Sequence, residues 1–151
     1  AYRPGILGFK SLWVRGDLEW APVRAAIPLL VGEKDFATFT RAAIVKSGER
    51  TVRRIDGVDV IESRPYIFLY IRGSGFLHNM IRILTGTLLD VARGKISPQQ
   101  MEQIVANADR LGAGVTQKPD ALYFLHAEYK DYPQEGAEHW LRRVLVEKLQ
   151  A

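Results

Sequence analysis

The sequence has no cysteine among its 151 residues. Disulfides, thiolate nucleophiles and cysteine-bound zinc are therefore excluded, and a reducing compartment is the natural environment. The sequence also lacks a charged leader followed by an apolar run, and no apolar stretch approaches the roughly 20 residues that a membrane-spanning helix needs. Together these absences predict a cytoplasmic protein with no membrane partner.

Signature motifs of common catalytic sites are missing as well. The histidines at positions 78, 126 and 139 have no second histidine at ligand spacing, so we expect no metal site. Gly73-Ser74-Gly75 lacks the third glycine and the Lys-Ser/Thr ending of a phosphate-binding loop. No Gly-x-Ser-x-Gly elbow occurs, and no two carboxylates are placed on one face. The chain thus offers a binding surface without a complete catalytic set. An independent hydrolase has little support because no nucleophile and base can be paired.

Composition predicts one soluble globular domain over residues 1–151, with 47% hydrophobic and 25% charged residues. Lys and Arg exceed Asp and Glu by 21 to 17, and the resulting net charge of +4 suits a polyanionic partner. Between residues 41 and 54 only Glu49 opposes a group of basic residues: Arg41, Lys46, Arg50, Arg53 and Arg54. This segment either meets nucleic-acid phosphates or forms an ordinary solvated face.

Residues 65–94 organise the chain. The apolar run 66–71 predicts a strand, residues 72–75 predict a tight turn, and apolar residues at helical spacing predict a helix from Phe76 to Gly94. A second stripe of this helix carries mostly polar residues at the same spacing: His78, Asn79, Arg82, Thr85 and Gly86. We expect ligand contacts along this stripe, although periodicity alone also allows Arg82 to be a surface arginine.

The remaining pattern predicts an α+β fold. We expect further strands at 11–15, 51–62 and 120–129, the second with a bulge at Asp56-Gly57. Further helices are expected at 17–32, where Pro28 interrupts the pattern, and at 134–150. Another helix should begin at the capping box formed by Ser97 and Gln100. Residues 1–10 are expected to form a connector and 41–50 a loop. The order predicts an antiparallel or mixed sheet with helices packed mainly on one face. Tyr66 and Tyr70 are expected in the core rather than free to stack on bases.

Several short blocks occur together in one order. They are Gly32 with Asp35-Phe36 and Phe39; Lys46-Ser47 with Arg50-Thr51-Val52; Gly75 to Arg82 with Gly86 and Val91 to Gly94; and Ala121-Leu122-Tyr123 leading to Tyr129. In this combination the sequence, over most of residues 18–130, resembles the C-terminal half of the tRNA pseudouridine synthase A family. The resemblance implies that this chain is the C-terminal domain of such an enzyme. It also implies that the domain has the fold of a ferredoxin-like half.

The resemblance also implies roles for individual residues. The arginine matching Arg82 pairs with a catalytic aspartate and keeps it ionised, and the leucine matching Leu122 lines the uridine pocket. Other residues fall in segments that face RNA: Lys46, Ser47, Arg50, Thr51, Arg53, His78 and Asn79. The implied reaction breaks the uridine N-glycosidic bond and rejoins the flipped base through carbon, with no cofactor or metal.

One part of the family pattern is absent. The family's aspartate belongs to an Arg-Thr-Asp motif in its N-terminal half, and no aspartate follows Arg-Thr in this sequence. We therefore expect a chain that is inactive alone and whose partners are tRNA and a missing N-terminal catalytic domain. A homodimer stays open as a further partnership. The loop 116–121, Lys34 and Pro28 also depart from the family. The alternative is a protein-interaction or dimerisation module that keeps the fold without the RNA.

Overall fold

The computed structural model describes residues 11–107, 110–125 and 127. The chain divides into two compact units, 1–120 and 121–151, and the first contains the sheet and its helices. Within the described residues no helix is both long and apolar enough to cross a membrane. The predicted connector 1–10 and the predicted helix 134–150 lie outside the described residues.

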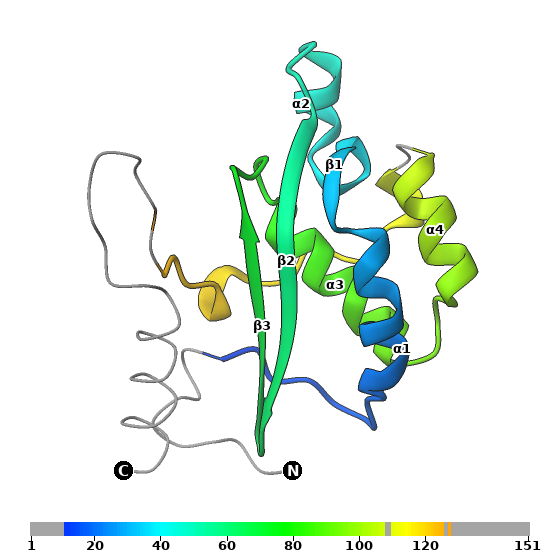
Figure 1. Cartoon of the computed structure of the whole chain (residues 1–151), viewed down its shortest axis with the longest axis vertical. Coiled ribbons are helices and arrows are strands. Elements are labelled where there is room, and N and C mark those ends of the chain that lie inside the picture. Colours follow the sequence, from blue (N-terminus) through cyan, green and yellow to red (C-terminus); the bar gives the residue numbers. More distant parts are fainter. Residues whose placement is uncertain (1–10, 108–109, 126, 128–151) are drawn as a thin grey trace. The chain divides into compact units, whose positions relative to one another are not determined.

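The sheet has three antiparallel strands in the order β1 (Gly32–Asp35), β2 (Val52–Ser63) and β3 (Tyr66–Gly73) (Figure 1). β2 and β3 form a hairpin, and their register shifts between Ile55 and Gly57, so the predicted bulge is confirmed. Because side chains alternate along a strand, Leu69 and Ile71 face the core, whereas Tyr66, Phe68 and Tyr70 share the opposite face. These three aromatic residues are half-buried, intermediate between core and free surface.

The longer helices pack together on one side of the β2–β3 hairpin (Figure 1). They are α1 (Trp20–Ala26), α3 (Met80–Ala92) and α4 (Pro98–Ala106). Pro28 ends the α-helical geometry of α1, which continues as the 3₁₀ turn η1 (Ile27–Leu29). Ser97 and Gln100 form the predicted capping box of α4. The α+β architecture with helices on one face of an antiparallel sheet is confirmed.

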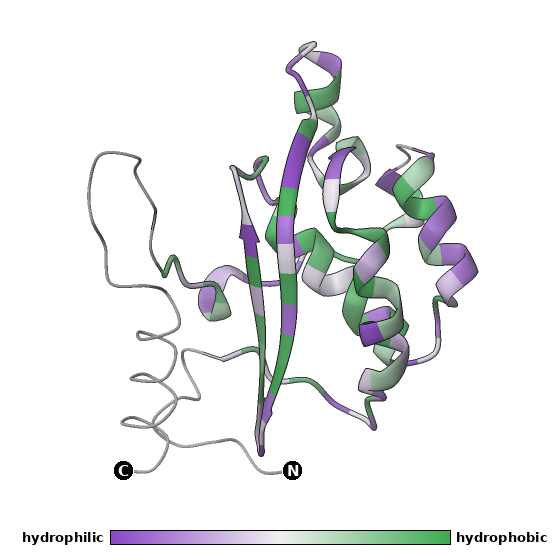
Figure 2. Ribbon diagram, viewed as in Figure 1, coloured by the Kyte–Doolittle hydropathy of each residue, from purple (hydrophilic) through white to green (hydrophobic). Residues whose placement is uncertain are grey.

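The core lies between this helical layer and the sheet. Its largest fully buried side chains come from α3, β2, α4 and the segment around β1: Leu30, Phe36, Phe39, Ile55, Met80, Ile83, Leu84, Leu88 and Met101. Hydrophobic and hydrophilic residues alternate along β2, and α4 turns a hydrophilic side outward (Figure 2). Two buried threonines join loops to this core, because Thr38 donates to the Ile104 carbonyl at 2.9 Å and Thr40 to the His78 carbonyl at 3.1 Å.

Several predicted elements differ from the structure. Residues 12–15 form no strand, and the expected helix end at Gly32 is instead the first residue of β1, which pairs with β2 although its sequence has low strand propensity. The expected loop 41–50 contains a short helix, α2 (Ala42–Lys46). The expected strand 120–129 is absent in its described part, where η4 (Pro119–Ala121) precedes an irregular segment. Pairing with β2 explains why β1 is a strand, and Pro119 at the start of η4 explains why the segment that follows is not a paired strand. Local periodicity does not reveal either effect.

The buried position of Leu84 yields a stability prediction. Leu84 is fully buried in the middle of α3, whereas Leu111 is 92% exposed. We expect Leu84→Ala to lower the free energy of unfolding by about 2–5 kcal/mol, because it leaves a cavity in the core. The matched change Leu111→Ala should stay within about 0.5 kcal/mol of the parent. Urea denaturation of the two variants measures the difference, and equal losses would contradict the described core.

Candidate functional site

Arg82 lies in the first turn of α3 and is half-buried. Its Nε donates a hydrogen bond to the Gln117 carbonyl at 2.6 Å, and its Nη1 donates to the Asn79 side-chain Oδ1 at 2.7 Å. The backbone of the same arginine is also engaged, since the Gln117 amide donates to the Arg82 carbonyl at 3.2 Å. Both the main chain and the side chain of Arg82 are therefore tied to residue 117.

The segment 113–117, here called the strap, runs along α3. The Gly114 amide donates to the Thr87 hydroxyl at 2.9 Å, and that hydroxyl donates in turn to the Ile83 carbonyl at 2.9 Å. Arg110 adds hydrogen bonds from its guanidinium to the Ala113 carbonyl and the Thr116 hydroxyl. Hydrogen bonds at both ends of the strap, of which the one at Gly114 is buried, hold it in one position on the helix.

Two glycines allow the strap to approach so closely. A Cβ at Gly86 would lie 2.0 Å from the Val115 carbonyl oxygen, and a Cβ at Gly114 would lie 2.5 Å from the Gly86 carbonyl carbon. Neither position has room for a side chain, because the obstructing atoms are backbone. The glycine at 86, which costs stability inside an isolated helix, is thus required by the contact with the strap.

The polar stripe predicted on the helix is only partly continuous. α3 begins at Met80, later than the predicted start at Phe76, because Asn79 has a left-handed backbone with φ 63°. Asn79 and Arg82 come together, whereas the Thr85 hydroxyl donates to the Ile81 carbonyl within the helix. The structure therefore keeps one hydrogen-bonded pair from the stripe, Asn79 and Arg82, whereas Thr85 bonds to the helix backbone.

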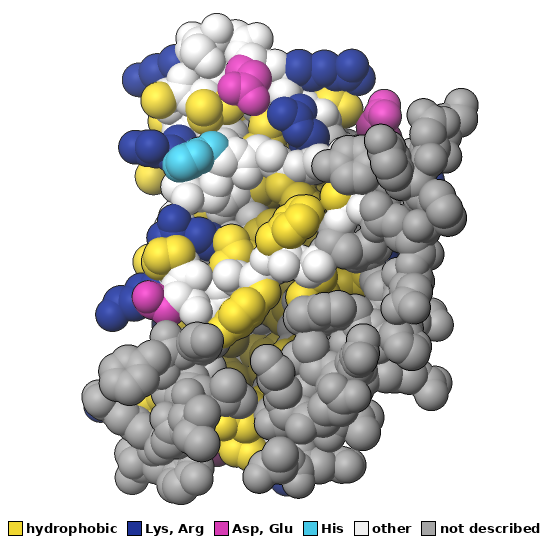
Figure 3. Space-filling view, turned by 90° about the vertical axis from the view of Figure 1, so that its left-hand side faces the viewer, with side chains coloured by type: hydrophobic (Ala, Val, Ile, Leu, Met, Phe, Trp, Pro, Cys, Tyr) yellow, Lys and Arg dark blue, Asp and Glu magenta, His cyan; other side chains and the backbone are white. Residues whose placement is uncertain are grey.

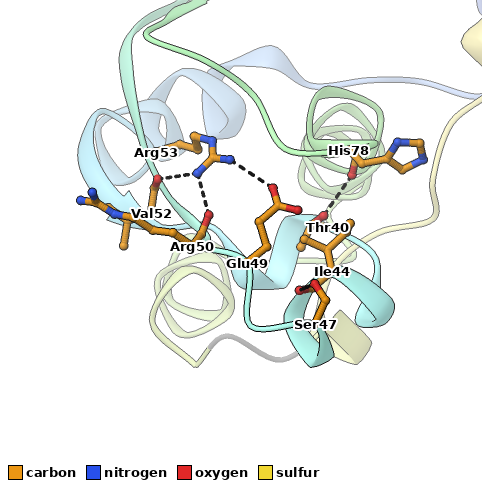
Figure 4. Close-up of polar contacts among 8 residues, drawn as sticks. All are labelled: Thr40, Ile44, Ser47, Glu49, Arg50, Val52, Arg53 and His78. Carbon is orange, nitrogen blue, oxygen red and sulfur yellow. Dashed lines mark hydrogen bonds and ion pairs between the residues drawn. The ribbon is translucent and has the colours of Figure 1, made fainter.

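The basic segment 41–54 comprises α2, the loop 47–51 and the start of β2, and the side chain of Arg53, which lies in β2, contacts that loop. Its Nη1 donates to the carbonyls of Arg50 and Val52 at 2.7 and 2.8 Å, and its Nη2 lies 3.5 Å from Glu49 (Figure 4). The Ser47 hydroxyl likewise donates to the Ile44 carbonyl. Arg53 thus holds the shape of the loop with three of its own neighbours.

Other basic side chains in and around this segment point to solvent. Lys46 and Arg50 are exposed, as is His78, whose backbone carbonyl accepts the Thr40 hydroxyl while its imidazole extends away from Glu49 (Figure 4). Thr51 is half-buried, and its carbonyl accepts the Phe36 amide at 3.1 Å. In the space-filling view Lys and Arg side chains gather around His78, the one histidine among the described residues (Figure 3). The first unit therefore presents a cationic surface near the start of α3.

Comparison with known proteins identifies the family of this chain. A family model described as tRNA pseudouridine synthase matches residues 26–130, which contain the sheet, α3, the basic loop and the strap. The chain belongs to this family. The resemblance predicted from the sequence blocks is thereby confirmed.

Individual relatives give the same result. The chain is 39% identical to tRNA pseudouridine synthase A of Leptospira biflexa over 134 residues, which cover 88% of this chain and 50% of the relative. It is 39% identical to the protein of that name from Leptospira interrogans, covering 83% and 61%, and 38% identical to that of Geobacter sulfurreducens, covering 80% and 48%. The chain spans about half the length of the curated relatives it matches.

Some predicted site residues of this synthase-family chain remain predictions. Leu122 belongs to the second unit, 121–151, so its predicted place in a uridine pocket near Arg82 is untested. Among the described residues no group of three or more His, Asp or Glu side chains is placed to hold a metal ion. The site described by contacts therefore consists of Arg82, Asn79 and the strap, with the basic loop as a separate surface.

Sequence reasoning missed the strap as a partner of Arg82. The loop 116–121 departs from the family pattern, yet Gln117 meets Arg82 through its main-chain amide and carbonyl. A backbone contact places no demand on side-chain identity, so the sequence could change without loss of the contact. The available signal was the pair of glycines at 86 and 114, because two glycines on facing segments indicate close backbone approach.

The close contact at Gly86 yields a second stability prediction. We expect Gly86→Ala to destabilise the chain by about 1–3 kcal/mol, because the added methyl displaces the strap backbone. Gly75→Ala is the matched control, since a Cβ there meets nothing within 4 Å. Thermal unfolding monitored by circular dichroism compares the two variants. A Gly86→Ala protein as stable as Gly75→Ala would contradict the described packing.

Proposed function

We propose that this chain is the C-terminal domain of a tRNA pseudouridine synthase, which isomerises uridine to pseudouridine in tRNA together with a polypeptide that carries the catalytic aspartate. The observation that carries the proposal is the guanidinium of Arg82, held by Asn79 and Gln117 at the family's arginine motif. Membership of the family and a span of about half the relatives' length support it. The activity needs no metal or cofactor, and its tRNA substrate places it in the cytoplasm.

The proposed chemistry assigns Arg82 an electrostatic role. Pseudouridine formation breaks the bond between the ribose C1′ and uracil N1, and joins C1′ to uracil C5. The C5 hydrogen leaves as a proton, and N1 takes up a proton, so the reaction is an isomerisation without net oxidation. A guanidinium at hydrogen-bond distance favours the ionised form of a carboxyl group. Arg82 would therefore keep the aspartate of the other half ready to act.

The RNA-binding part of the proposal rests on exposed cations. Lys46 is exposed at the end of α2, Arg50 is exposed in the following loop that Arg53 shapes, and His78 is exposed just before α3. Exposed Lys and Arg side chains gain affinity for RNA by releasing the counterions of phosphates. Arg53 supports this surface by holding the loop, and its remaining N–H groups can also reach a phosphate. Leu122 is assigned to the uridine pocket by the family motif.

The need for a second half can be tested directly. We expect this chain alone to release no tritium from tRNA labelled at uracil C5, and to become active when the Arg-Thr-Asp half is supplied, because the nucleophilic carboxylate comes from that half. Tritium release measures the reaction since the C5 proton leaves. Tritium release by this chain alone would contradict the proposal. The absence of tritium release after both halves assemble would also contradict it.

Arg82 itself can be tested in the assembled protein. We expect Arg82→Lys to lower kcat by about 10- to 100-fold, because a point ammonium cannot reproduce a planar, doubly hydrogen-bonded guanidinium. Arg54→Lys is the matched control, since Arg54 is exposed and forms a surface ion pair with Asp56 at 2.7 Å. Equal activity of the two variants would remove Arg82 from the proposed site.

The phosphate contacts predict a change in salt dependence. We expect Lys46→Ala and Arg50→Ala each to reduce the slope of log affinity for tRNA against log salt by roughly 0.7–0.9, the value for one phosphate contact. Lys95→Ala is the control, because Lys95 lies beyond the C-terminal end of α3 beside Asp90. Filter binding measures the slopes. Unchanged slopes would contradict these phosphate contacts. If sedimentation also shows a dimer that does not bind tRNA, the protein-interaction module is favoured instead.

A further inference from the structure

The guanidinium of Arg82 has a defined set of donors left over. Its single Nε hydrogen goes to the Gln117 carbonyl and one Nη1 hydrogen goes to Asn79 Oδ1, at distances typical of charge-assisted hydrogen bonds. Both Nη2 hydrogens and the second Nη1 hydrogen have no acceptor among the described residues. Nη2 can therefore still donate to a carboxylate, whereas Nε is occupied.

Two acceptors on different segments fix the plane of this guanidinium. Asn79 precedes α3, whereas Gln117 belongs to the strap, which Thr87 and Gly86 hold against the helix. A guanidinium held by a hydrogen bond at one nitrogen can still change the orientation of its plane. When it is held at both Nε and Nη1, it has a single orientation, and the catalytic group is preorganised.

Asn79 is suited to this position for two separable reasons. Its backbone is left-handed, with φ 63° and ψ 3°, a conformation in which asparagine and glycine are the tolerated residues. Its carbonyl accepts the Ile83 amide at 3.0 Å, which begins the hydrogen bonding of α3. Only the side-chain amide oxygen, however, reaches Arg82. Glycine at this position would keep the backbone and lose that oxygen.

We propose that Asn79 is a positioning residue of this site, whose Oδ1 orients the Arg82 guanidinium so that Nη2 faces the carboxylate brought by the other half. The inference rests on the proposed function and deepens it. It gives Asn79 a task distinct from the RNA contact that the family resemblance implies. Because Asn79 acts through Arg82 on the reacting carboxylate, its loss should affect turnover more than tRNA binding.

The test uses Asn79→Gly in the protein assembled with its aspartate-bearing half. We expect kcat for tritium release to fall about tenfold or more, the effect of losing one hydrogen bond to a charged group, with KM for tRNA unchanged within about twofold. The melting temperature should not fall, because glycine favours φ 63°. The matched control is Asn107→Gly at the C-cap of α4, which should retain parental activity.

A double-mutant cycle separates positioning from a structural role. In an Arg82→Lys background no Nη1 atom remains to be oriented, so adding Asn79→Gly should cause no further loss of kcat. If Asn79 only starts the helix, the two losses should multiply. The cycle also decides the matter if Asn79→Gly proves less stable than expected, since it compares the same change in two backgrounds.

The outcomes distinguish this inference from the function on which it rests. Absence of tritium release from the parental assembled protein overturns the proposed function itself. Parental activity with Asn79→Gly as active as Asn107→Gly overturns the positioning role alone, and so do losses that multiply in the cycle. A loss of kcat that vanishes in the Arg82→Lys background supports the positioning role.

Discussion

The contact between the strap and α3 is the constraint on which the site depends. Gly86 and Gly114 let two backbones approach without intervening side chains, and Thr87 ties them with a buried hydroxyl. This contact brings the Gln117 carbonyl to the Arg82 guanidinium. A flexible arginine thereby becomes a fixed donor, which is what electrostatic catalysis requires of a charged group.

The same fold places its cations in different environments. Arg82 is half-buried and held by acceptors from two segments, whereas Lys46 stays exposed at the end of α2 and Arg50 in the following loop, to which Arg53 of β2 donates. Burial and hydrogen bonding suit a residue that must orient a reacting group, and exposure suits residues that meet phosphates. Charge alone does not distinguish these environments, but the contacts do.

Periodicity predicted much of the fold, because β2, β3, α3 and α4 bury regular apolar stripes against one core. It failed where tertiary contacts decide, as in β1, whose four residues become a strand by pairing with β2. The motif around Arg82 predicted the family, which the comparisons confirm, while the contact with Gln117 was missed because it acts through its backbone. Asn79 was noted, but its left-handed conformation and its bond to Arg82 follow from coordinates.

The most direct test of the central claim is a crystal structure of this chain assembled with the half that carries the Arg-Thr-Asp motif. The quantity to measure is the distance from Arg82 Nη2 to the nearest carboxylate oxygen of that aspartate. A separation of about 2.7–2.9 Å, the length of a charge-assisted hydrogen bond, is predicted. An aspartate beyond about 6 Å, outside the range of a close charge pair, would contradict the account.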